Sequence, residues 1–213
     1  MKAGVYDFFY KYWAPWDAVG VREDLKALLA SGLVDPTQFP RSVDLGCGSG
    51  ANVVYLAAQG FDSYGIDFSP VGLAKARERA AEAAVECTFI QGDLTADSIE
   101  GLGGVFDFLI DFGTLDDLRG VNRRAMVATI DRLSRPGSVF LEWCFYGPVE
   151  DLPLISFSGP SRAFMSPERA QERLAPTLVP GEVEELFGDK WEIEPYSANP
   201  DRRQAAFLLT KKP

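Results

Sequence analysis

A short glycine-rich run and one carboxylate downstream of it are the residues of this chain best suited to binding a ligand. Gly46 and Gly48 lie in the run Val-Asp-Leu-Gly-Cys-Gly-Ser-Gly, residues 43–50, and Asp67 follows. Glycines let the backbone turn sharply and come close to a ligand. A carboxylate about 20 residues later can accept hydrogen bonds from ribose hydroxyls. The spacing predicts a nucleotide-like cofactor; the alternative is a tight turn in which Asp67 caps the helix beginning at Ser69.

Asp44 distinguishes between the two cofactor classes that this glycine pattern admits. Gly46, Gly48 and Ala51 also satisfy the dinucleotide pattern G-x-G-x-x-G/A. A carboxylate just before the first glycine would repel a pyrophosphate, whereas it would attract a cationic amino acid. We therefore expect a cationic, ribose-bearing cofactor and keep an NAD(P)-dependent oxidoreductase as the second hypothesis. A non-catalytic cofactor-binding module is the third.

The chain contains no histidine, and this absence excludes several kinds of catalysis. Ser-His-Asp and Cys-His nucleophile systems need an imidazole, and zinc, copper and non-haem iron take histidine as their commonest ligand. We expect no metal site, and any proton transfer must use Asp, Glu, Tyr, Lys or water. Cys47, Cys87 and Cys144 form no CxxC pair, so we expect buried thiols rather than a disulfide framework.

Charge and hydropathy limit the partners. The chain carries 31 acidic and 21 basic residues, a net charge of -10, and such a surface repels a phosphate backbone, so nucleic acid is not an expected partner. Its apolar runs fall short of the roughly 20 residues that span a membrane, and residues 1–7 lack a signal-peptide pattern. We expect a cytoplasmic protein without a membrane partner; the sequence does not predict its oligomeric state.

Strand-like and helix-like stretches alternate from Arg41 onward, and 213 residues with 46% hydrophobic content are enough for one α/β domain. Such alternation predicts a mostly parallel sheet with helices on both faces. The last two strands have a short link, which permits only an antiparallel hairpin. The expected strands are 42–45, 62–66, 86–90, 105–110, 138–144, 191–196 and 204–210. The expected helices are 22–30, 51–59, 69–82, 121–133 and 180–187.

Aromatic residues in two regions are candidates for the walls of a substrate pocket. Residues 1–40 are expected to form an aromatic N-terminal lid or helices packed on the core, and residues 41–213 the cofactor-binding domain. The loop 145–165 is expected to add further apolar walls. A helix packed on the sheet is the alternative for the N-terminal rings. The residues concerned are Tyr6, Phe8, Phe9, Tyr10, Tyr12, Trp13 and Trp16, and, in the loop, Phe157, Phe164 and Met165. Arg162 of the same loop could meet an acidic group, or it could be solvated.

Residues 43–50 resemble motif I of the class I S-adenosylmethionine-dependent methyltransferases, and the expected hairpin resembles the seventh-strand insertion of that family. The resemblance covers the chain from Arg41 onward. It implies a Rossmann-like seven-stranded sheet, S-adenosyl-L-methionine as cofactor, and methyl transfer to a small molecule. The cofactor-binding residues that it implies are Trp16, Asp44, Gly46, Cys47, Gly48, Asp67, Phe68, Asp93, Leu94, Asp111, Phe112 and Gly113.

The resemblance also implies separate roles for several of these residues. Asp67 would bind the ribose hydroxyls, and Phe68 would lie against adenine. Asp93 would reach the adenine amino group, with Leu94 packed on the ring. Residues 111–113 would line the methionine side of the cofactor. The alternative for the aspartates at 93 and 111 is that they cap turns.

A narrower resemblance connects the chain with the thiopurine, halide and tellurite methyltransferases. It depends on Pro15-Trp16-Asp17, on the small size and on residues 111–118. Trp16 would then close over the cofactor. That branch often has a Phe-His pair where this chain has Leu115-Asp116, so a carboxylate replaces an imidazole. Asp116 or Asp117 could orient a substrate or accept a proton, or either could cap the next helix.

Methyl transfer is an in-line displacement from a sulfonium, so an enzyme gains much by holding the acceptor and the methyl group in line in a dry pocket. Thiolates, halides and neutral amines attack without a base, whereas an alcohol or phenol usually needs its proton removed. The missing histidine therefore favours a soft or pre-ionised sulfur, halide or nitrogen acceptor, with oxygen as the remaining option. The candidate catalytic residues are Asp116, Glu142 and Tyr146.

Overall fold

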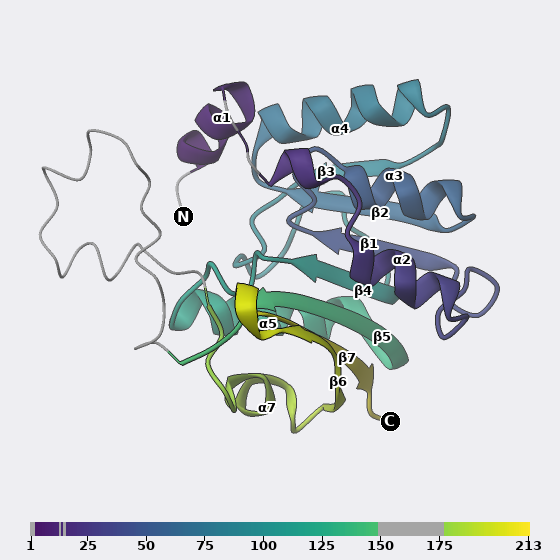
Figure 1. Ribbon diagram of the computed structural model, residues 1–213. Helices are drawn as coiled ribbons and strands as arrows, with labels where there is room; N and C mark the ends of the chain where they lie inside the picture. Colours follow the sequence, from purple (N-terminus) through teal and green to yellow (C-terminus); the bar gives the residue numbers. More distant parts are fainter. Residues whose placement is uncertain (1–2, 13, 15, 149–176) are drawn as a thin grey trace, which may run out of the picture.

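A seven-stranded sheet forms the centre of the computed structural model, which describes residues 3–12, 14, 16–148 and 177–213. The strands are β1 (Arg41–Leu45), β2 (Asp62–Asp67), β3 (Thr88–Gln91), β4 (Phe106–Phe112), β5 (Ser134–Phe145), β6 (Trp191–Asn199) and β7 (Gln204–Lys211). Their order is β3-β2-β1-β4-β5-β7-β6 (Figure 1). Strands β1 to β5 pair in parallel, whereas β7 runs antiparallel to β5 and β6. The predicted Rossmann-like sheet with an antiparallel C-terminal hairpin is confirmed.

Helices cover both faces of this sheet. Leu28 of α2 and Leu56 of α3 belong to the core on one face. Ile130 of α5 and Phe187 of α7 belong to the core on the other. The helices are α1 (Ala3–Tyr12), α2 (Glu23–Ala30), α3 (Ala51–Ala58), α4 (Pro70–Glu82), α5 (Val121–Leu133) and α7 (Glu182–Phe187), with the short 3-10 turns η1 (Asp17–Val19) and η4 (Pro200–Arg202). The predicted placement of helices on both faces is therefore confirmed.

The strand order reverses beside β1, and this reversal positions the site. β1 lies between β2 and β4, so the chain leaves β1 toward one edge of the sheet and later returns on the other side. In open α/β sheets, ligands bind at such a switch point, outside the carboxyl ends of the strands. Gly46 follows β1, Asp67 ends β2 and Gly113 follows β4. These three residues therefore meet where the topology favours a ligand.

The start of β5 differs from the sequence expectation. The sequence predicts a strand from residue 138, whereas β5 begins at Ser134 and includes Pro136. Ser134 pairs with Phe106, and the register then shifts before Val139 pairs with the next residue but one on β4. Such a bulge takes extra residues out of the ladder of hydrogen bonds, which allows a proline within the strand.

The N-terminal aromatic stretch forms α1, which contacts α4. Phe8 is 59% exposed and Tyr12 is 64% exposed, so the alternative in which these rings pack on the sheet is wrong for both. The division into an N-terminal lid and a cofactor-binding domain stays a prediction. Four expected loop residues and one tryptophan lie outside the described residues: Phe157, Arg162, Phe164, Met165 and Trp13.

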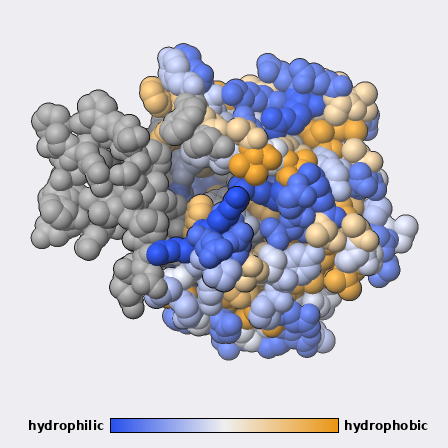
Figure 2. Space-filling model, viewed as in Figure 1, coloured by the Kyte–Doolittle hydropathy of each residue, from blue (hydrophilic) through white to orange (hydrophobic). Residues whose placement is uncertain are grey.

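The surface is mainly polar on the face drawn in Figure 2, where hydrophilic residues surround smaller hydrophobic areas. Scattered apolar residues of this kind are normal on folded proteins. Within the described ranges, none of the helices combines the length and hydropathy that crossing a bilayer requires.

Candidate cofactor site

The carboxylate that ends β2 holds the glycine loop that follows β1. Asp67 is buried, and its two oxygens accept hydrogen bonds from Gly48 N and from Ser69 N, each at 2.8 Å. Burial raises the pKa of Asp67, while these backbone donors lower it. A carboxylate oxygen has two lone pairs. Asp67 can therefore hold the loop and the start of α4 and still accept a hydroxyl.

Gly46 and Gly48 both adopt backbone conformations that favour glycine, with φ of +83° and +52°. A Cβ atom at Gly46 would collide with Oγ1 of Thr114, and a Cβ atom at Gly48 would collide with Oη of Tyr10. Thr114 belongs to the loop after β4, and Tyr10 belongs to α1. The bare backbone of the glycine loop is therefore enclosed from two sides.

Asp44 brings a buried carboxylate to the base of a small cavity. The cavity measures about 60 Å³, and Asp44, Arg22 and the glycine loop line it. The Asp44 side chain accepts a hydrogen bond from Nδ2 of Asn52 at 3.5 Å. Burial, and then the neighbouring carboxylate of Asp111, raises the pKa of Asp44 to about 8. A cation placed in the cavity would stabilise the charged form of this group.

Arg22 supplies the opposite charge in the same cavity. Its guanidinium carbon lies 4.7 Å from the ring centroid of Trp143 and 5.8 Å from that of Phe112. Both rings lie at the carboxyl ends of their strands, and cation–π contacts of this kind hold a guanidinium in place. Burial lowers the pKa of Arg22, and the nearby Asp44 raises it. A carboxylate near Arg22 and an ammonium near Asp44 match the two charges of a free amino-acid group.

Side chains of α1 cover the other end of the glycine loop. The Tyr10 hydroxyl accepts a hydrogen bond from Nε1 of Trp16 at 3.2 Å. The Tyr6 ring packs edge-on against Phe68, with centroids 5.2 Å apart. Asp7 accepts a hydrogen bond from the Ser69 hydroxyl at 2.5 Å. These contacts tie α1 to the residues that follow β2.

The donors and charges fit a cationic, ribose-bearing cofactor, but the room on the adenosine side is filled by this chain. A pocket for a drug-sized ligand holds about 300 to 1,000 Å³, against the roughly 60 Å³ beside Asp44. Tyr10 lies on Gly48, and Tyr6 lies on Phe68, the ring predicted to face adenine. We therefore expect binding of such a cofactor to move these two tyrosines.

The loop after β4 is held by Asp111, which accepts hydrogen bonds from Thr114 N at 2.9 Å and Leu115 N at 2.7 Å. Asp93 likewise accepts from Thr95 N at 2.8 Å. These are the turn-capping contacts named above as the alternative for both aspartates. Their contacts with a cofactor, and those of Gly113 beside them, stay predictions.

Asp116 is fully buried, and its Oδ2 accepts a hydrogen bond from Phe145 N at 2.7 Å. Helix α5 begins after Gly120 without a side-chain cap, so the helix-capping alternative for Asp116 is wrong. Its Oδ1 has no hydrogen-bond partner among the described residues. The neighbouring Asp117 accepts a hydrogen bond from the Tyr6 hydroxyl. The two adjacent aspartates therefore have different contacts, one with β5 and one with α1.

Glu142 adds another buried carboxyl group, next to that of Asp111. It pairs with Asp111 across β4 and β5, and Asp111 is the one side chain that influences its carboxyl group as a hydrogen-bond partner among the described residues. Burial and the carboxylates of Asp111 and Asp116 raise the pKa of Glu142. Burial also raises the pKa of Asp111 to about 6. Three carboxyl groups thus crowd the carboxyl ends of β4 and β5.

Tyr146 lies apart from these carboxylates. Its ring packs against that of Phe207, with 5.3 Å between the centroids, and burial, and then the carboxylate of Glu184 on α7, raises its pKa.

Leu94 is buried in the core on the α5 face, and its contact with adenine stays a prediction. Cys47 lines the small cavity. Cys47 and Cys144 are buried as expected, whereas Cys87 is partly exposed, so that expectation is wrong for one thiol.

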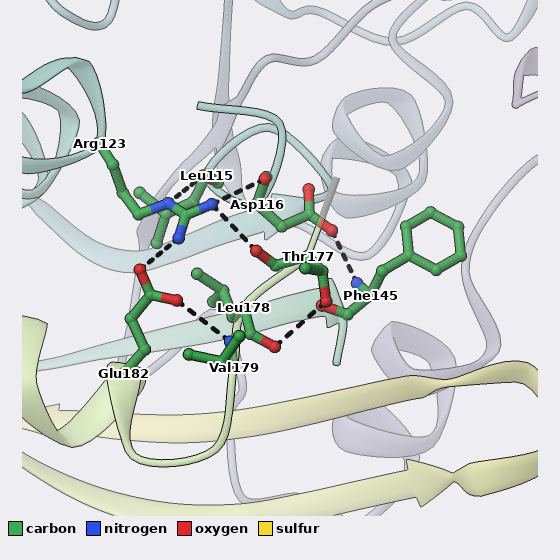
Figure 3. Close-up of polar contacts among 8 residues, drawn as sticks. All are labelled: Leu115, Asp116, Arg123, Phe145, Thr177, Leu178, Val179 and Glu182. Carbon is green, nitrogen blue, oxygen red and sulfur yellow. Dashed lines mark hydrogen bonds and ion pairs between the residues drawn. The ribbon is translucent and has the colours of Figure 1, made fainter. Parts of the chain in front are cut away.

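Two arginines at this site were not predicted from the sequence. Nothing in the sequence distinguishes Arg22, because its partners come from distant strands. Arg123 is buried, and it donates hydrogen bonds to the carbonyls of Leu115, Asp116 and Thr177 at 3.2, 2.9 and 3.0 Å (Figure 3). It could have been found, because helical spacing puts residue 123 on the same face as the apolar residues 126, 127 and 130.

The family model and three curated proteins to which this chain is similar are methyltransferases. The family described as a methyltransferase domain matches residues 43–137. A 2-heptyl-1-hydroxyquinolin-4(1H)-one methyltransferase of Mycobacteroides abscessus is 26% identical over 132 residues, covering 62% of this chain and 56% of that protein. The chain spans about half the length of the curated relatives it matches.

Solved structures share the fold. One, from work on the conversion of a disulfide bond into a thioacetal group during echinomycin biosynthesis, has a TM-score of 0.73 at 21% identity, covering 99% of this chain and 93% of the other. Another is magnesium protoporphyrin IX methyltransferase from Synechocystis with bound S-adenosylhomocysteine, with a TM-score of 0.63 at 21% identity, covering 88% and 80%. At such identities the likeness extends to the fold and no further.

Proposed function

We propose that the chain, whose residues 43–137 match a methyltransferase domain, is a class I S-adenosylmethionine-dependent methyltransferase and transfers a methyl group from S-adenosyl-L-methionine to a small molecule. One observation carries the proposal. Asp44 and Arg22 present opposite charges in one cavity against the glycine loop, with Asp67 at the end of the next strand. This set matches a ligand that has an amino-acid head and a ribose.

Each of these residues would contact a different part of the cofactor. Asp44 would face the ammonium, Arg22 the carboxylate and Asp67 the ribose hydroxyls, while Phe68 and Leu94 would border adenine. The bound cofactor supplies a methyl group on a cationic sulfur. Trp16, Cys47, Phe112 and Gly113 would complete the walls, as the family resemblance implies.

We propose a neutral acceptor. The missing histidine favours a soft or pre-ionised nucleophile, but an anionic thiolate or halide would approach the carboxyl groups of Asp111, Asp116 and Glu142, whose negative forms would repel it. The hydroxyquinolone methyltransferase named above is a relative whose substrate is a small hydroxylated ring. The net charge of -10 makes nucleic acid a poor acceptor.

We further propose that α1 is a lid and that the protein works in the cytoplasm. Tyr10 and Tyr6 lie where the adenosine half of the cofactor would lie, so the helix must shift for binding. The thiols of Cys47, Cys87 and Cys144, which are free in the structure, would stay reduced in that compartment.

Calorimetric titration with S-adenosylhomocysteine and, separately, with NADH tests this function. We expect binding of S-adenosylhomocysteine and none of NADH, because a pyrophosphate beside the glycine loop would meet the carboxylate of Asp44. Arg22→Gln should weaken binding about tenfold or more, since a hydrogen bond to a charged group contributes roughly 1.5 to 3 kcal/mol. Lys26→Gln, which removes an exposed charge from α2, is the matched control. Binding of NADH without S-adenosylhomocysteine would favour the oxidoreductase hypothesis instead.

A further inference from the structure

Asp116 carries a buried carboxylate oxygen for which the described part of the chain supplies no partner. The residue is fully buried, Oδ2 accepts the hydrogen bond from Phe145 N, and Oδ1 accepts none there. A buried acceptor without a partner costs roughly 1 to 3 kcal/mol, and more when the group is charged. Such groups call for an explanation, and a catalytic role is one of the few that apply.

The free oxygen lies beside the proposed cofactor cavity. A Cβ atom built on Gly113 would lie 3.8 Å from Asp116 Oδ1 and 3.7 Å from a ring atom of Trp143. The same Trp143 ring carries the guanidinium of Arg22, which lines the cavity. Asp116 Oδ1 is therefore close to the methionine side of the proposed site, at the carboxyl ends of β4 and β5.

Arg123 fixes the backbone of this aspartate. Its guanidinium donates to the carbonyl oxygens of Leu115 and Asp116 on one side and of Thr177 on another, and it pairs with Glu182 (Figure 3). Each contact uses the rigid fork of N–H donors that a guanidinium provides. With the backbone held here and Oδ2 held by β5, the direction of Oδ1 is set by the fold.

We infer that Asp116 is the catalytic base of the proposed methyl transfer, that Arg123 is its positioning residue, and that the acceptor is a hydroxyl compound. The inference rests on the proposed function. The acceptor's O–H bond breaks and its proton passes to Oδ1 of Asp116. The bond from oxygen to the methyl carbon forms as the carbon–sulfur bond breaks, its electron pair remaining on sulfur. The proton then leaves Asp116 for solvent.

A hydroxyl suits this oxygen better than the other acceptor classes. A neutral amine attacks through its lone pair, and a thiolate or halide has no proton to lose, so none of these needs a buried base. A phenol or N-hydroxy group donates one hydrogen bond, which would satisfy the free oxygen in the bound state. Binding of such an acceptor would therefore give Oδ1 of Asp116 the hydrogen-bond donor that the described residues do not supply.

The charged surroundings give the base a useful pKa. Burial, and then the carboxylates of Asp111 and Asp117, raises the pKa of Asp116 to about 8, while the Phe145 N–H and Arg123 lower it. A general base is most effective when its pKa lies near the working pH. Rates should therefore rise as pH increases through about 8 and then level off. The titratable and charged groups that face Asp116 are Tyr6, Arg22, Asp111, Asp117, Arg123, Glu142 and Cys144.

The test compares the wild type with Asp116→Asn, using labelled S-adenosylmethionine and matched acceptors: 4-nitrophenol and 1-hydroxyquinolin-4(1H)-one, against thiophenol, aniline and iodide. We expect methylation of at least one hydroxyl compound. Asp116→Asn, which can still accept from Phe145 N, should lower kcat roughly 100-fold or more and remove its rise with pH. Asp97→Asn, an exposed carboxylate changed in the same way, is the matched control and should behave as wild type.

Arg123 provides a second, independent measurement. Arg123→Gln should move the rising part of the kcat–pH curve to higher pH, because the cation that lowers the pKa of Asp116 is gone, and Arg123→Lys should partly restore it. A merely structural role would leave the midpoint of the pH curve unchanged.

Several results would overturn the inference without touching the proposed function. These are turnover of thiophenol, aniline or iodide but of no hydroxyl compound, an unaltered pH curve in Asp116→Asn, or binding of S-adenosylhomocysteine with no methylation of either hydroxyl acceptor. Loss of S-adenosylhomocysteine binding in Asp116→Asn would likewise contradict it by making Asp116 a cofactor ligand. Failure of the wild type to bind S-adenosylhomocysteine would instead contradict the proposed function itself.

Discussion

The hydroxyl of Tyr10 lies directly against Gly48, so close that a methyl group on that glycine would collide with it. The two residues come from the N-terminal helix and from the loop after β1, which a nucleotide-like cofactor must approach. Burial raises the pKa of Tyr10, and so does the nearby carboxylate of Asp67. The phenol therefore remains neutral where a ribose hydroxyl is expected to bind.

Tyr10→Ala should strengthen cofactor binding. A protein whose binding-competent state is partly populated binds with an affinity reduced by that fraction, and removing the ring favours the open state. We expect about a threefold to tenfold lower Kd for S-adenosylhomocysteine and faster association, measured by calorimetry and stopped-flow fluorescence. Tyr12→Ala, on the same helix but 64% exposed, is the matched control. Weaker binding in Tyr10→Ala would mean that the ring contacts the cofactor instead of blocking it.

Asp67→Ala should weaken cofactor binding at least tenfold, because each hydrogen bond to a charged group contributes roughly 1.5 to 3 kcal/mol. The same change removes the acceptor for Gly48 N, so the glycine loop also loses a support. Calorimetry with S-adenosylhomocysteine measures the affinity, and circular dichroism verifies the fold. Asp62→Ala, at the exposed start of the same strand, should bind as the wild type does. Equal affinity in a folded Asp67→Ala would refute the ribose role.

The free energy of unfolding should fall as pH rises from about 4 to about 8. Burial raises the pKa of Asp44 and of Asp116 from 3.8 to about 8 in the folded state. Between these values the folded protein binds more protons than the unfolded chain, so stability is complete below the unfolded pKa and is lost as pH passes the folded one. Each group contributes up to about 1.4 kcal/mol per pH unit.

Urea unfolding at pH 5 and pH 8 measures this loss. The double variant Asp44→Asn with Asp116→Asn should depend less on pH, because neither amide titrates. Asp97→Asn should keep the wild-type dependence. If the wild type grew more stable over this range, the buried carboxyl groups would not control its stability.

Arg123→Met should destabilise the fold by about 3 to 5 kcal/mol, because it removes the cation paired with the partly buried carboxylate of Glu182 and one hydrogen bond to each of three carbonyls. Thermal and urea unfolding measure the change. Arg124→Met alters the next residue of the same helix, which faces solvent, and should cost less than about 0.5 kcal/mol. Equal effects of the two variants would show that the network around Arg123 adds no stability.

The sheet could be predicted because its signals are local. Val43 and Leu45 on a short strand, the glycines after it and the short link between β6 and β7 are each readable within a few residues. The start of β5 could not be read this way, since Ser134 joins the strand through its pairing with Phe106, far away in sequence. Local sequence pattern therefore predicts which strands exist, whereas pairing between distant strands determines where β5 begins.

The candidate site was predictable to a lesser extent. Asp44, Asp67 and the glycine loop follow from motif and spacing, because the consecutive elements β1, α3 and β2 position them. The partners of Arg22, which are Asp44, Phe112 and Trp143, come from three separate strands, and the hydrogen bond from Phe145 N to Asp116 joins residues 29 positions apart. Such contacts exist only after the strands have been ordered in space, so a single sequence contains no pattern for them.

The pairing of β5 with the chain around Leu178 has a consequence for how this protein could diversify. Leu178 N donates to the carbonyl of Phe145 at 2.9 Å, and Gly147 N donates to the carbonyl of Leu178 at 3.2 Å. Residues 145–147 and 177–178 are thus fixed to each other, and Arg123 holds the second segment through the carbonyl of Thr177. The free-energy cost of joining two fixed ends grows slowly with the length of the chain between them, so residues exchanged or inserted between these two segments would leave the sheet and the carboxylates in register. Acceptor preference could then evolve separately from the donor site.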